Sequence, residues 1–266
     1  MLDFSNSKIL IVGDVMLDKY YFGKVDRISP EAPVPIVNIQ KEESRLGGAS
    51  NVANNIVSLG GHSLLCGVIG HDLFGKEIER ISRHKNIDTF LLKTSSPTIT
   101  KARIIGGKQQ IVRVDYEDKS ELNADNKKLF RDTISRILPE YDILVISDYG
   151  KGLISEDLCR YLIKLAHKYD KKVIIDPKGK NWEKYSGADI VTPNVKELSD
   201  IVGYTVPNTD RAIEKAAREA ITNNHLTALL VTRSDKGMSL IGPIPPIHIP
   251  THSEEVFDVS GAGDTV

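Results

Sequence analysis

The sequence predicts an α/β fold in which a mostly parallel central sheet is flanked by helices. Short apolar segments alternate with segments of helical periodicity along most of the chain, and this alternation is typical of successive βαβ units. The short segments are apolar throughout, as strands that are buried on both faces require. Two further segments alternate apolar and polar residues with period two, which predicts a small antiparallel sheet beside the main one.

The strand-like segments have the length and the apolar composition of buried strands. They are Lys8–Gly13, His62–Ile69, Asp142–Ser147, Lys172–Asp176, Asp189–Thr192 and Ala228–Thr232. Sheets of this kind bind ligands beyond the carboxyl ends of their strands. The residues that directly follow these segments are therefore the first candidates for a functional site.

Helical spacing of apolar residues fills the intervals between these strands. The predicted helices are Asn51–Leu59, Leu73–His84, Asn123–Leu138, Ser155–Tyr169, Val195–Val202 and Thr209–Asn223. Ser155 and Thr209 are suitable N-caps, because a hydroxyl oxygen can accept a hydrogen bond from an unpaired N–H group of the first helical turn.

Period-two alternation marks Tyr20–Gln40 and Pro97–Asp115. In the second of these segments, Gly106-Gly107 predicts a hairpin turn. We expect residues of about 18–42 and 96–116 to form a four-stranded flap within a single domain that spans 1–266. A flap with one solvated face could serve as a lid or as a dimer surface.

The composition limits the class of protein. The chain has 266 residues, and its 35 Lys and Arg against 36 Asp and Glu give a formal net charge of −1, which argues against general binding to nucleic acids or membrane surfaces. No basic N-terminal segment precedes a long apolar stretch, and nowhere do 18 apolar residues run together, so a cytoplasmic location is expected. Cys66 and Cys159 lie in apolar runs without metal-ligand spacing, which predicts reduced core residues.

Gly261, Ala262 and Gly263 directly precede Asp264. Two glycines around a small residue let backbone N–H groups converge on an anion, and the carboxylate that follows can reach a neighbouring hydroxyl. A carboxylate base beside an anion hole is what phosphoryl transfer to an alcohol requires. The hypothesis for this segment is therefore a catalytic Asp264 with the preceding three residues as its anion hole.

The segment Gly47-Gly48-Ala49-Ser50-Asn51 opens a predicted helix. Its glycines permit the close approach of a ligand, and Asn51 offers a donor and an acceptor to sugar hydroxyls. A plain loop-to-helix turn that is capped by Ser50 or Asn51 explains the same residues equally well.

Asp14 and Asp18 follow the first predicted strand. A carboxylate at the carboxyl end of a strand can bind two adjacent hydroxyls. Asp18 is the preferred candidate for this role, because Asp14 is equally suited to forming a turn.

Asn194-Val195-Lys196-Glu197 begins another predicted helix. Asn194 and Glu197 lie on one face of its first turn, which suits them to hold Mg²⁺ through water beside the phosphates of a nucleotide. An ordinary capping box, in which Glu197 reaches back to the cap, is the alternative.

Thr232 ends the last predicted strand, and Ser234 and Gly237 follow it. Their hydroxyls and the glycine could line a nucleotide phosphate at the edge of the sheet. A simple hairpin between Ala228–Thr232 and Met238–Ile241 explains them as well.

Several cations occupy strand or strand-end positions, where a charge is not needed for solubility: Arg103, Arg113, Lys151 and Lys178. Two or three of them converging would bind an anionic group of a substrate. Each of them alone is explained by a solvated surface charge.

Together these motifs resemble the ribokinase-like (PfkB) family of carbohydrate kinases. Gly-Gly-x-x-Asn at 47–51, Asn-x-x-Glu at 194–197 and Gly-Ala-Gly-Asp at 261–264 occur in the order and at the separations that the family shows, and the resemblance covers the whole chain. It implies a ribokinase-like sandwich with a β-lid, ATP as phosphate donor, and Mg²⁺. The implied site residues are Asp264 as the base, Gly261, Ala262 and Gly263 as the anion hole, Asp18, Gly47, Gly48 and Asn51 at the sugar, Asn194 and Glu197 at Mg²⁺ and phosphate, and Val195, Lys196, Thr232, Ser234 and Gly237 at the nucleotide.

Within this family, Ser29–Pro35, Asp148–Gly152 and Asp176–Gly179 resemble the branch of heptose-7-phosphate kinases. That branch phosphorylates the anomeric hydroxyl of a sugar that already bears a 7-phosphate, for lipopolysaccharide precursors. The cations named above, together with Asp148, would suit such a substrate. Another kinase of the same fold, acting on ribose, fructose phosphate or a nucleoside, stays open, as does a sugar-binding module without turnover.

The resemblance also implies a homodimer through the β-lid and, in many organisms, fusion of this kinase to a nucleotidyltransferase domain. Family members continue well past Gly-Ala-Gly-Asp, with helices that close the nucleotide pocket. We therefore expect those C-terminal helices to be missing from this chain, its sheet to be partly uncovered and its binding of ATP to be weak.

Overall fold

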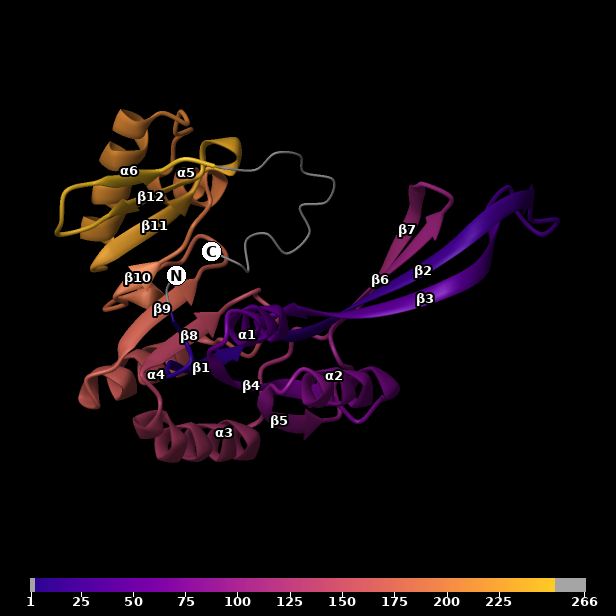
Figure 1. Ribbon diagram of the computed structural model, residues 1–266, viewed down its shortest axis with the longest axis horizontal. Coiled ribbons are helices and arrows are strands. Elements are labelled where there is room, and N and C mark those ends of the chain that lie inside the picture. The colour runs from indigo at the N-terminus through magenta and orange to yellow at the C-terminus, as the bar shows by residue number, and fades with distance from the viewer. Residues whose placement is uncertain (1–2, 252–266) are drawn as a thin grey trace.

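The computed structural model describes residues 3–251. Among these residues, the main sheet has nine strands in the order β13-β12-β11-β10-β9-β8-β1-β4-β5. From β11 to β5 all neighbours pair in parallel, and β12 and β13 add an antiparallel edge. Helices pack against this sheet (Figure 1), and the predicted α/β class is confirmed.

The predicted strands are present, each within one residue at either end. The main sheet consists of β1 (Lys8–Gly13), β4 (His62–Gly70), β5 (Asp88–Thr94), β8 (Ile143–Ser147), β9 (Lys172–Asp176), β10 (Ile190–Val191), β11 (Ala228–Thr232), β12 (Met238–Ile241) and β13 (Ile247–Ile249). The strands β5 and β13 were not among the predicted strands. Both are edge strands with exposed or half-buried residues, so they lack the continuous apolar pattern of central strands.

The predicted helices are present within two residues at either end. They are α1 (Ala49–Ser58), α2 (Leu73–His84), α3 (Ala124–Ile137), α4 (Glu156–Lys168), α5 (Val195–Val202) and α6 (Asp210–Asn223). Ser155 caps α4 by accepting a hydrogen bond from the N–H of Leu158 at 3.3 Å. Thr209 is the N-cap of α6, but its side chain makes no capping bond. No helix among residues 3–251 is long and apolar enough to cross a membrane.

The strand β1 shows why the central strands are apolar throughout. Leu10 and Val12 face a core that they share with α3 and α4, whereas Ile9 and Ile11 face a second core under α1 and α2. All of these side chains are buried. A strand between two cores has no solvated face and so leaves no position for a polar residue.

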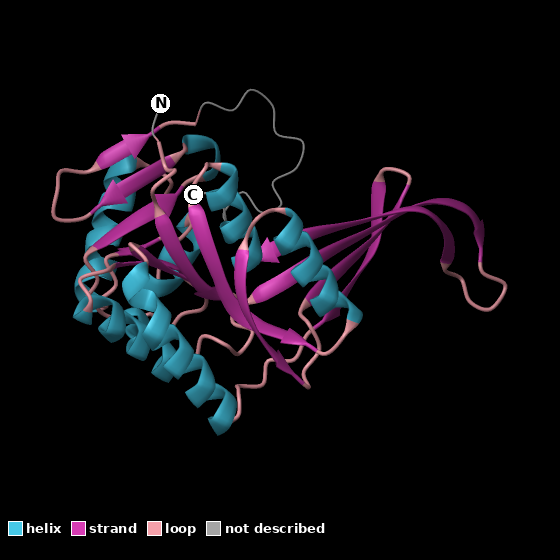
Figure 2. Cartoon of the chain, turned by 60° about the horizontal axis from the view of Figure 1, so that its bottom comes forward, coloured by secondary structure: helices cyan, strands magenta, loops and turns pink. Residues whose placement is uncertain are grey.

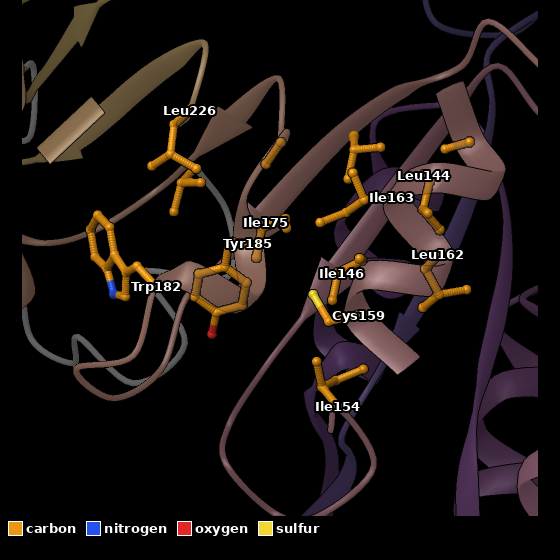
Figure 3. Packing of buried hydrophobic residues seen from close by; sticks show 14 of the residues in the cluster. Leu144, Ile146, Ile154, Cys159, Leu162, Ile163, Ile175, Trp182, Tyr185 and Leu226 are labelled. Carbon is orange, nitrogen blue, oxygen red and sulfur yellow. The ribbon is translucent and has the colours of Figure 1, made fainter. Parts of the chain in front are cut away.

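Both cysteines are free and fully buried, as predicted. Figure 3 shows Cys159 of α4 beside Ile146 of β8. Burial raises the pKa of the Cys159 thiol to about 12 and also raises the pKa of Cys66. Because the thiolate is the reactive form, neither side chain is a nucleophile at neutral pH.

A separate four-stranded sheet, called the flap from here on, consists of β2 (Val15–Ile28), β3 (Pro35–Gly48), β6 (Thr100–Gly106) and β7 (Gln109–Tyr116), in the order β3-β2-β6-β7. It projects from one side of the main body (Figures 1 and 2). The antiparallel pairing expected of this sheet holds for its hairpins, β2–β3 and β6–β7. The hairpins join through a parallel pair, β2–β6, because both of these strands leave the main body in the same direction.

Candidate active site

The parallel strands of the main sheet end at one edge, and three cavities border this edge in the described part of the chain. The flap cavity, of about 710 Å³, lies between the flap and α1. The α5 cavity, of about 570 Å³, lies at the first turn of α5, and the Asp14 cavity, of about 340 Å³, lies at the end of β1. All three have the size of small-molecule sites.

Asp18, Gly48, Asn51 and Arg103 line the flap cavity. They come from β2, the end of β3, α1 and β6, and Asp18 and Arg103 are 85 positions apart in the sequence. The structure therefore brings together four of the residues for which the sequence predicted a substrate-binding role.

Asp18 and Arg103 form an ion pair in the wall of this cavity. Nη1 of Arg103 donates to Oδ1 of Asp18 at 2.5 Å, and the two side chains are only 17% and 21% exposed. Although burial opposes the charge of Arg103, its hydrogen bond to Asp18 raises its pKa. The pair presents a fixed carboxylate and a fixed guanidinium to a ligand at the same place.

Gly47 and Gly48 are required by the packing around two aspartates. A Cβ on Gly47 would lie 2.3 Å from Oδ2 of Asp18, and a Cβ on Gly48 would lie 2.6 Å from the carbonyl oxygen of Asp14. Gly48 also has a φ of +53°, which favours glycine. It is the N-cap of α1, without a capping side chain, and Ser50 instead donates to the carbonyl oxygen of Gly47 at 2.7 Å. The loop-to-helix turn of the alternative explanation is therefore present, but its N-cap is Gly48 rather than Ser50 or Asn51.

Arg45 and Lys101 also line the flap cavity, and sequence reasoning missed both. Each is a cross-strand neighbour of Asp18, so the three share one face of the flap. Burial lowers the pKa of Lys101. The positive charges of Lys151 and Arg103 lower this pKa further, whereas the negative charge of Asp18 raises it. Period-two alternation puts Lys101 on the same face as Arg103, and this signal could have found it.

The other predicted substrate-binding residues do not line the flap cavity. Arg113 lies opposite Arg103 on β7, but it donates to the carboxylate of Asp115 at 2.8 and 3.0 Å. Its guanidinium is therefore held by a neighbour two residues away on the same strand, and its side chain is half exposed.

Asp148, Lys151 and Lys178 also have internal partners. Asp148 is buried, where it accepts a hydrogen bond from the Tyr185 hydroxyl at 2.7 Å and pairs with Lys184. Lys151 pairs with Glu117 and lines the Asp14 cavity, and Nζ of Lys178 lies 3.4 Å from Glu197 on α5. These partners come from distant segments, which is why spacing along the sequence could not reveal them.

Asp14, the less favoured of the two early candidates, is the more deeply buried. It is 2% exposed, and its Oδ2 accepts hydrogen bonds from the N–H groups of Tyr149 at 2.8 Å and of Lys151 at 3.1 Å. Its Oδ1 has no hydrogen-bond partner among the described residues. Burial raises the pKa of Asp14 to about 6, and the charge of Asp148 adds to the shift.

The free energy of unfolding is expected to depend on pH through Asp14. Because its pKa is raised on folding, its proton stabilises the folded chain fully below the ordinary value of 3.8, and this contribution is lost as the pH rises through about 6. The loss is about 3 kcal/mol. Asp14→Asn should therefore gain stability relative to the wild type between about pH 4 and pH 7, as urea unfolding at each pH would show. A difference that is constant over this range would contradict the raised pKa.

The α5 cavity brings together another set of predicted residues. It is lined by Asn194, Val195, Lys196, Thr232, Ser234 and Gly237. Because β10 and β11 are parallel neighbours, the residues that follow them meet at one edge, where Thr232 N–H donates to the carbonyl oxygen of Pro193 at 2.9 Å. The hairpin β11–β12 is also present, so the hairpin and the cavity are compatible explanations of these residues.

Glu197 lies beside this cavity and completes a capping box. Its N–H donates to Oδ1 of Asn194 at 2.9 Å, and its Oε2 accepts from the N–H of Asn194 at 3.1 Å. The same carboxylate faces the ammonium of Lys178. The capping alternative is therefore confirmed, and the capping box holds Glu197 at the start of α5.

The remaining predicted site residues are Gly261, Ala262, Gly263 and Asp264, and they lie outside the described residues 3–251.

The fold is shared with solved structures of sugar kinases. The tetrameric inhibited form of phosphofructokinase-2 from Escherichia coli matches 97% of this chain and 84% of its own with a TM-score of 0.79 at 20% sequence identity. The same enzyme in complex with substrates and products matches 97% of this chain and 83% of its own with a TM-score of 0.77 at 19% identity. At this level of identity the likeness concerns the fold alone.

Sequence comparison finds more similar relatives. Bifunctional protein HldE of Haemophilus influenzae (strain PittEE) is 46% identical over 266 residues, which cover 99% of this chain and 55% of the relative. Bifunctional protein HldE of Actinobacillus pleuropneumoniae serotype 5b (strain L20) is 44% identical over 265 residues, which cover 99% of this chain and 54% of the relative. The chain thus spans about half the length of the curated relatives that it matches. A family model described as pfkB family carbohydrate kinase matches residues 6–266, and the chain therefore belongs to this family.

Proposed function

We propose that the chain transfers the γ-phosphoryl group of ATP to the anomeric hydroxyl of a sugar phosphate, D-glycero-D-manno-heptose 7-phosphate, and so makes the 1,7-bisphosphate for lipopolysaccharide core precursors. Membership of the family supports a carbohydrate kinase with ATP as donor. The strings at 29–35, 148–152 and 176–179 support the heptose branch. The observation that carries the proposal is the flap cavity, in which groups suited to sugar hydroxyls lie beside an excess of cations.

The sugar end of the ligand is assigned to Asp18 and Asn51. Both line the flap cavity, and a carboxylate and an amide together can accept from and donate to vicinal hydroxyls.

The phosphate end is assigned to Lys101 and Arg103, with Arg45 beside them. Lys101 makes a contact with the ring of Tyr149, 5.5 Å from its Nζ to the ring centroid, and has no ion pair within the described residues. A half-buried ammonium without a carboxylate partner is unfavourable unless an anion binds there. A phosphate group on the substrate supplies that anion and can also bond the guanidinium of Arg103.

ATP is assigned to the α5 cavity. Thr232 and Ser234 offer hydroxyls to its phosphates, and Asn194 offers an amide at the start of α5. No group of three or more His, Cys, Asp or Glu residues that could hold a metal ion is found among residues 3–251. Glu197 and Asn194 still fit Mg²⁺, because this ion is commonly held by one carboxylate together with water and the phosphates of the nucleotide. Bound Mg²⁺ would offset negative charge on those phosphates.

In the proposed reaction, Asp264 accepts the proton of the anomeric hydroxyl as that oxygen attacks the γ-phosphorus and ADP leaves. The N–H groups of Gly261–Gly263 are assigned to the negative charge that develops on the transferred group. The motif and the membership of the family support these proposed roles.

The test is a panel of acceptors assayed for release of ADP. We expect turnover with heptose 7-phosphate and values of kcat/KM at least about tenfold lower with fructose 6-phosphate, ribose and a nucleoside. Turnover that is fastest with a nucleoside or an unphosphorylated sugar would contradict the substrate. Binding of the sugar phosphate by calorimetry, without turnover in any assay, would instead favour a sugar-binding module.

The flap also supports the proposed homodimer. Val112, Val114 and Tyr116 alternate on β7 and are 45%, 39% and 45% exposed, so they give one face of an edge strand an apolar surface. A second copy of the chain would cover this surface. Val112→Glu combined with Val114→Glu is expected to convert a dimer to a monomer in light scattering, since it would bury like charges in the interface. A wild-type protein that is monomeric at all concentrations would contradict the dimer.

The whole protein is proposed to carry a second activity. The relatives are named bifunctional, and this chain corresponds to 55% of such a relative. We assign this second activity to a nucleotidyltransferase domain, because such a domain accompanies the kinase of the heptose branch in many organisms.

A further inference from the structure

Asp14 connects three segments around the flap cavity. Its N–H donates to the carbonyl oxygen of Ser147 at 3.1 Å, and its carbonyl oxygen accepts from the N–H of Ala49 at 3.1 Å. Its Oδ2 accepts from the N–H groups of Tyr149 and Lys151. The end of β1 is thereby tied to the end of β8, to the start of α1 and to the loop that follows β8.

Two of these segments contribute residues to the wall of the flap cavity. Ala49 begins α1, which contributes Asn51 to the cavity. Tyr149 lines the cavity as well, and its ring lies against the ammonium of Lys101. Asp14 does not itself line the flap cavity, so any effect that it has on a ligand there passes through these neighbours.

The carboxylate of Asp14 is not the most stable choice for its position. It is buried, its Oδ1 has no hydrogen-bond partner among residues 3–251, and the residue lines the Asp14 cavity. Burying a carboxylate oxygen without a partner is unfavourable. Its Oδ2 holds the backbone of Tyr149 across 135 positions of sequence, so the role of Asp14 is not confined to the turn after β1.

We propose that Asp14 is a positioning residue for sugar-phosphate binding, whose carboxylate fixes the backbone of Tyr149 so that the Tyr149 ring holds Lys101 toward the ligand. The identity of the ligand rests on the proposed function, whereas the contacts of Asp14 do not. The α5 cavity is built from α5, β11 and β12 and their connections. The effect is therefore confined to the sugar phosphate and spares the nucleotide.

The test compares Asp14→Leu, which has a similar size and no acceptor, with Asp14→Asn, which keeps one acceptor oxygen for the two N–H groups. Dissociation constants for heptose 7-phosphate and for a non-hydrolysable ATP analogue are measured by calorimetry on the full-length protein. Asp14→Leu is expected to raise the Kd of the sugar phosphate roughly tenfold or more, because two bonds to a charged acceptor are lost. The Kd of the ATP analogue should stay within about twofold, and Asp14→Asn should restore most of the sugar affinity.

Asp142 provides a matched control. Its Oδ2 accepts from the N–H of Lys8 at 2.9 Å, so it joins β8 to β1 at the opposite edge of the sheet. Asp142→Leu removes the same kind of bond between the same strands and should leave both dissociation constants unchanged. If Asp14→Leu does not fold, Asp14→Ser replaces it, since the shorter hydroxyl cannot reach both N–H groups.

A double-mutant cycle tests the route of the effect. Because Asp14 acts through Tyr149, the combination of Asp14→Leu with Tyr149→Leu should weaken sugar-phosphate binding no more than the stronger single variant. Additive effects, or equal weakening of the sugar phosphate and the ATP analogue, would overturn the proposal. A wild-type protein that binds no sugar phosphate would instead overturn the proposed function.

Discussion

Replacing Asp264 with Asn is expected to lower kcat by about 10²–10⁴-fold, the usual contribution of a positioned general base. The amide has the shape of the carboxylate but cannot take the proton of the attacking hydroxyl. The Kd of the sugar phosphate should change by less than about twofold, because the assigned binding groups lie on the flap and α1. Release of ADP at saturating substrate measures the first quantity, and calorimetry measures the second.

Asp142 is a suitable control for this variant, since its carboxylate accepts from the N–H of Lys8 at 2.9 Å at the opposite edge of the sheet. Asp142→Asn should keep most of the turnover. If Asp264→Asn retained more than about a tenth of the wild-type kcat, a general base with the contribution above could not be Asp264.

Replacing Asp18 with Asn is expected to weaken sugar-phosphate binding by about 10–100-fold, because hydrogen bonds to a charged group are worth about 1.5–3 kcal/mol. The variant loses the charged acceptor for the sugar hydroxyls and also the partner of Arg103. The two residues are coupled through their ion pair. The combination of Asp18→Asn with Arg103→Met should therefore weaken binding by less than the product of the single effects.

The same flap contains a matched control for this pair. Asp115 holds Arg113 through two hydrogen bonds of 2.8 and 3.0 Å, and neither residue lines the flap cavity. Asp115→Asn should therefore change the Kd of the sugar phosphate by less than about twofold, since exposed ion pairs contribute little. Equal effects of Asp18→Asn and Asp115→Asn would show that the flap cavity is not the sugar site.

The main sheet could be predicted from the sequence because its central strands have no solvated face. Residues such as Ile9 and Leu10 on β1 face different cores, and this leaves a continuous apolar segment in the sequence. The edge strand β5 has a neighbouring strand on one side only, and its residues Asp88–Thr94 are exposed or half-buried, so its sequence mixes polar and apolar residues. A search for continuous apolar segments therefore finds the central strands of the sheet and misses its edge strands.

The candidate site was predictable where neighbouring strands fix it. Thr232 ends β11 and Asn194 follows β10, and these parallel strands end at the same edge, so the topology brings the two residues together. In the flap, by contrast, the register of β2 with β3 and β6 decides which cations face Asp18. That register selects Arg45 and Lys101, and a shift by one residue would have turned each of them to the other face.

Asp14 illustrates what the sequence cannot provide. Its separation from Asp18 is short, and both carboxylates follow β1. Asp18 lines the flap cavity, whereas Asp14 is buried and bonds to the loop that follows β8. Only the structure shows this difference between the two carboxylates. Such contacts depend on which strands become neighbours, here β1 and β8.

The proposed function requires that a sugar phosphate receives a second phosphate at its anomeric carbon. Phosphorus NMR of heptose 7-phosphate incubated with the protein, ATP and Mg²⁺ tests this claim. The predicted result is a new phosphorus resonance coupled to the anomeric proton, formed in an amount equal to the ADP released. A new phosphate on any other carbon, or release of ADP at the same rate without the sugar, would contradict it.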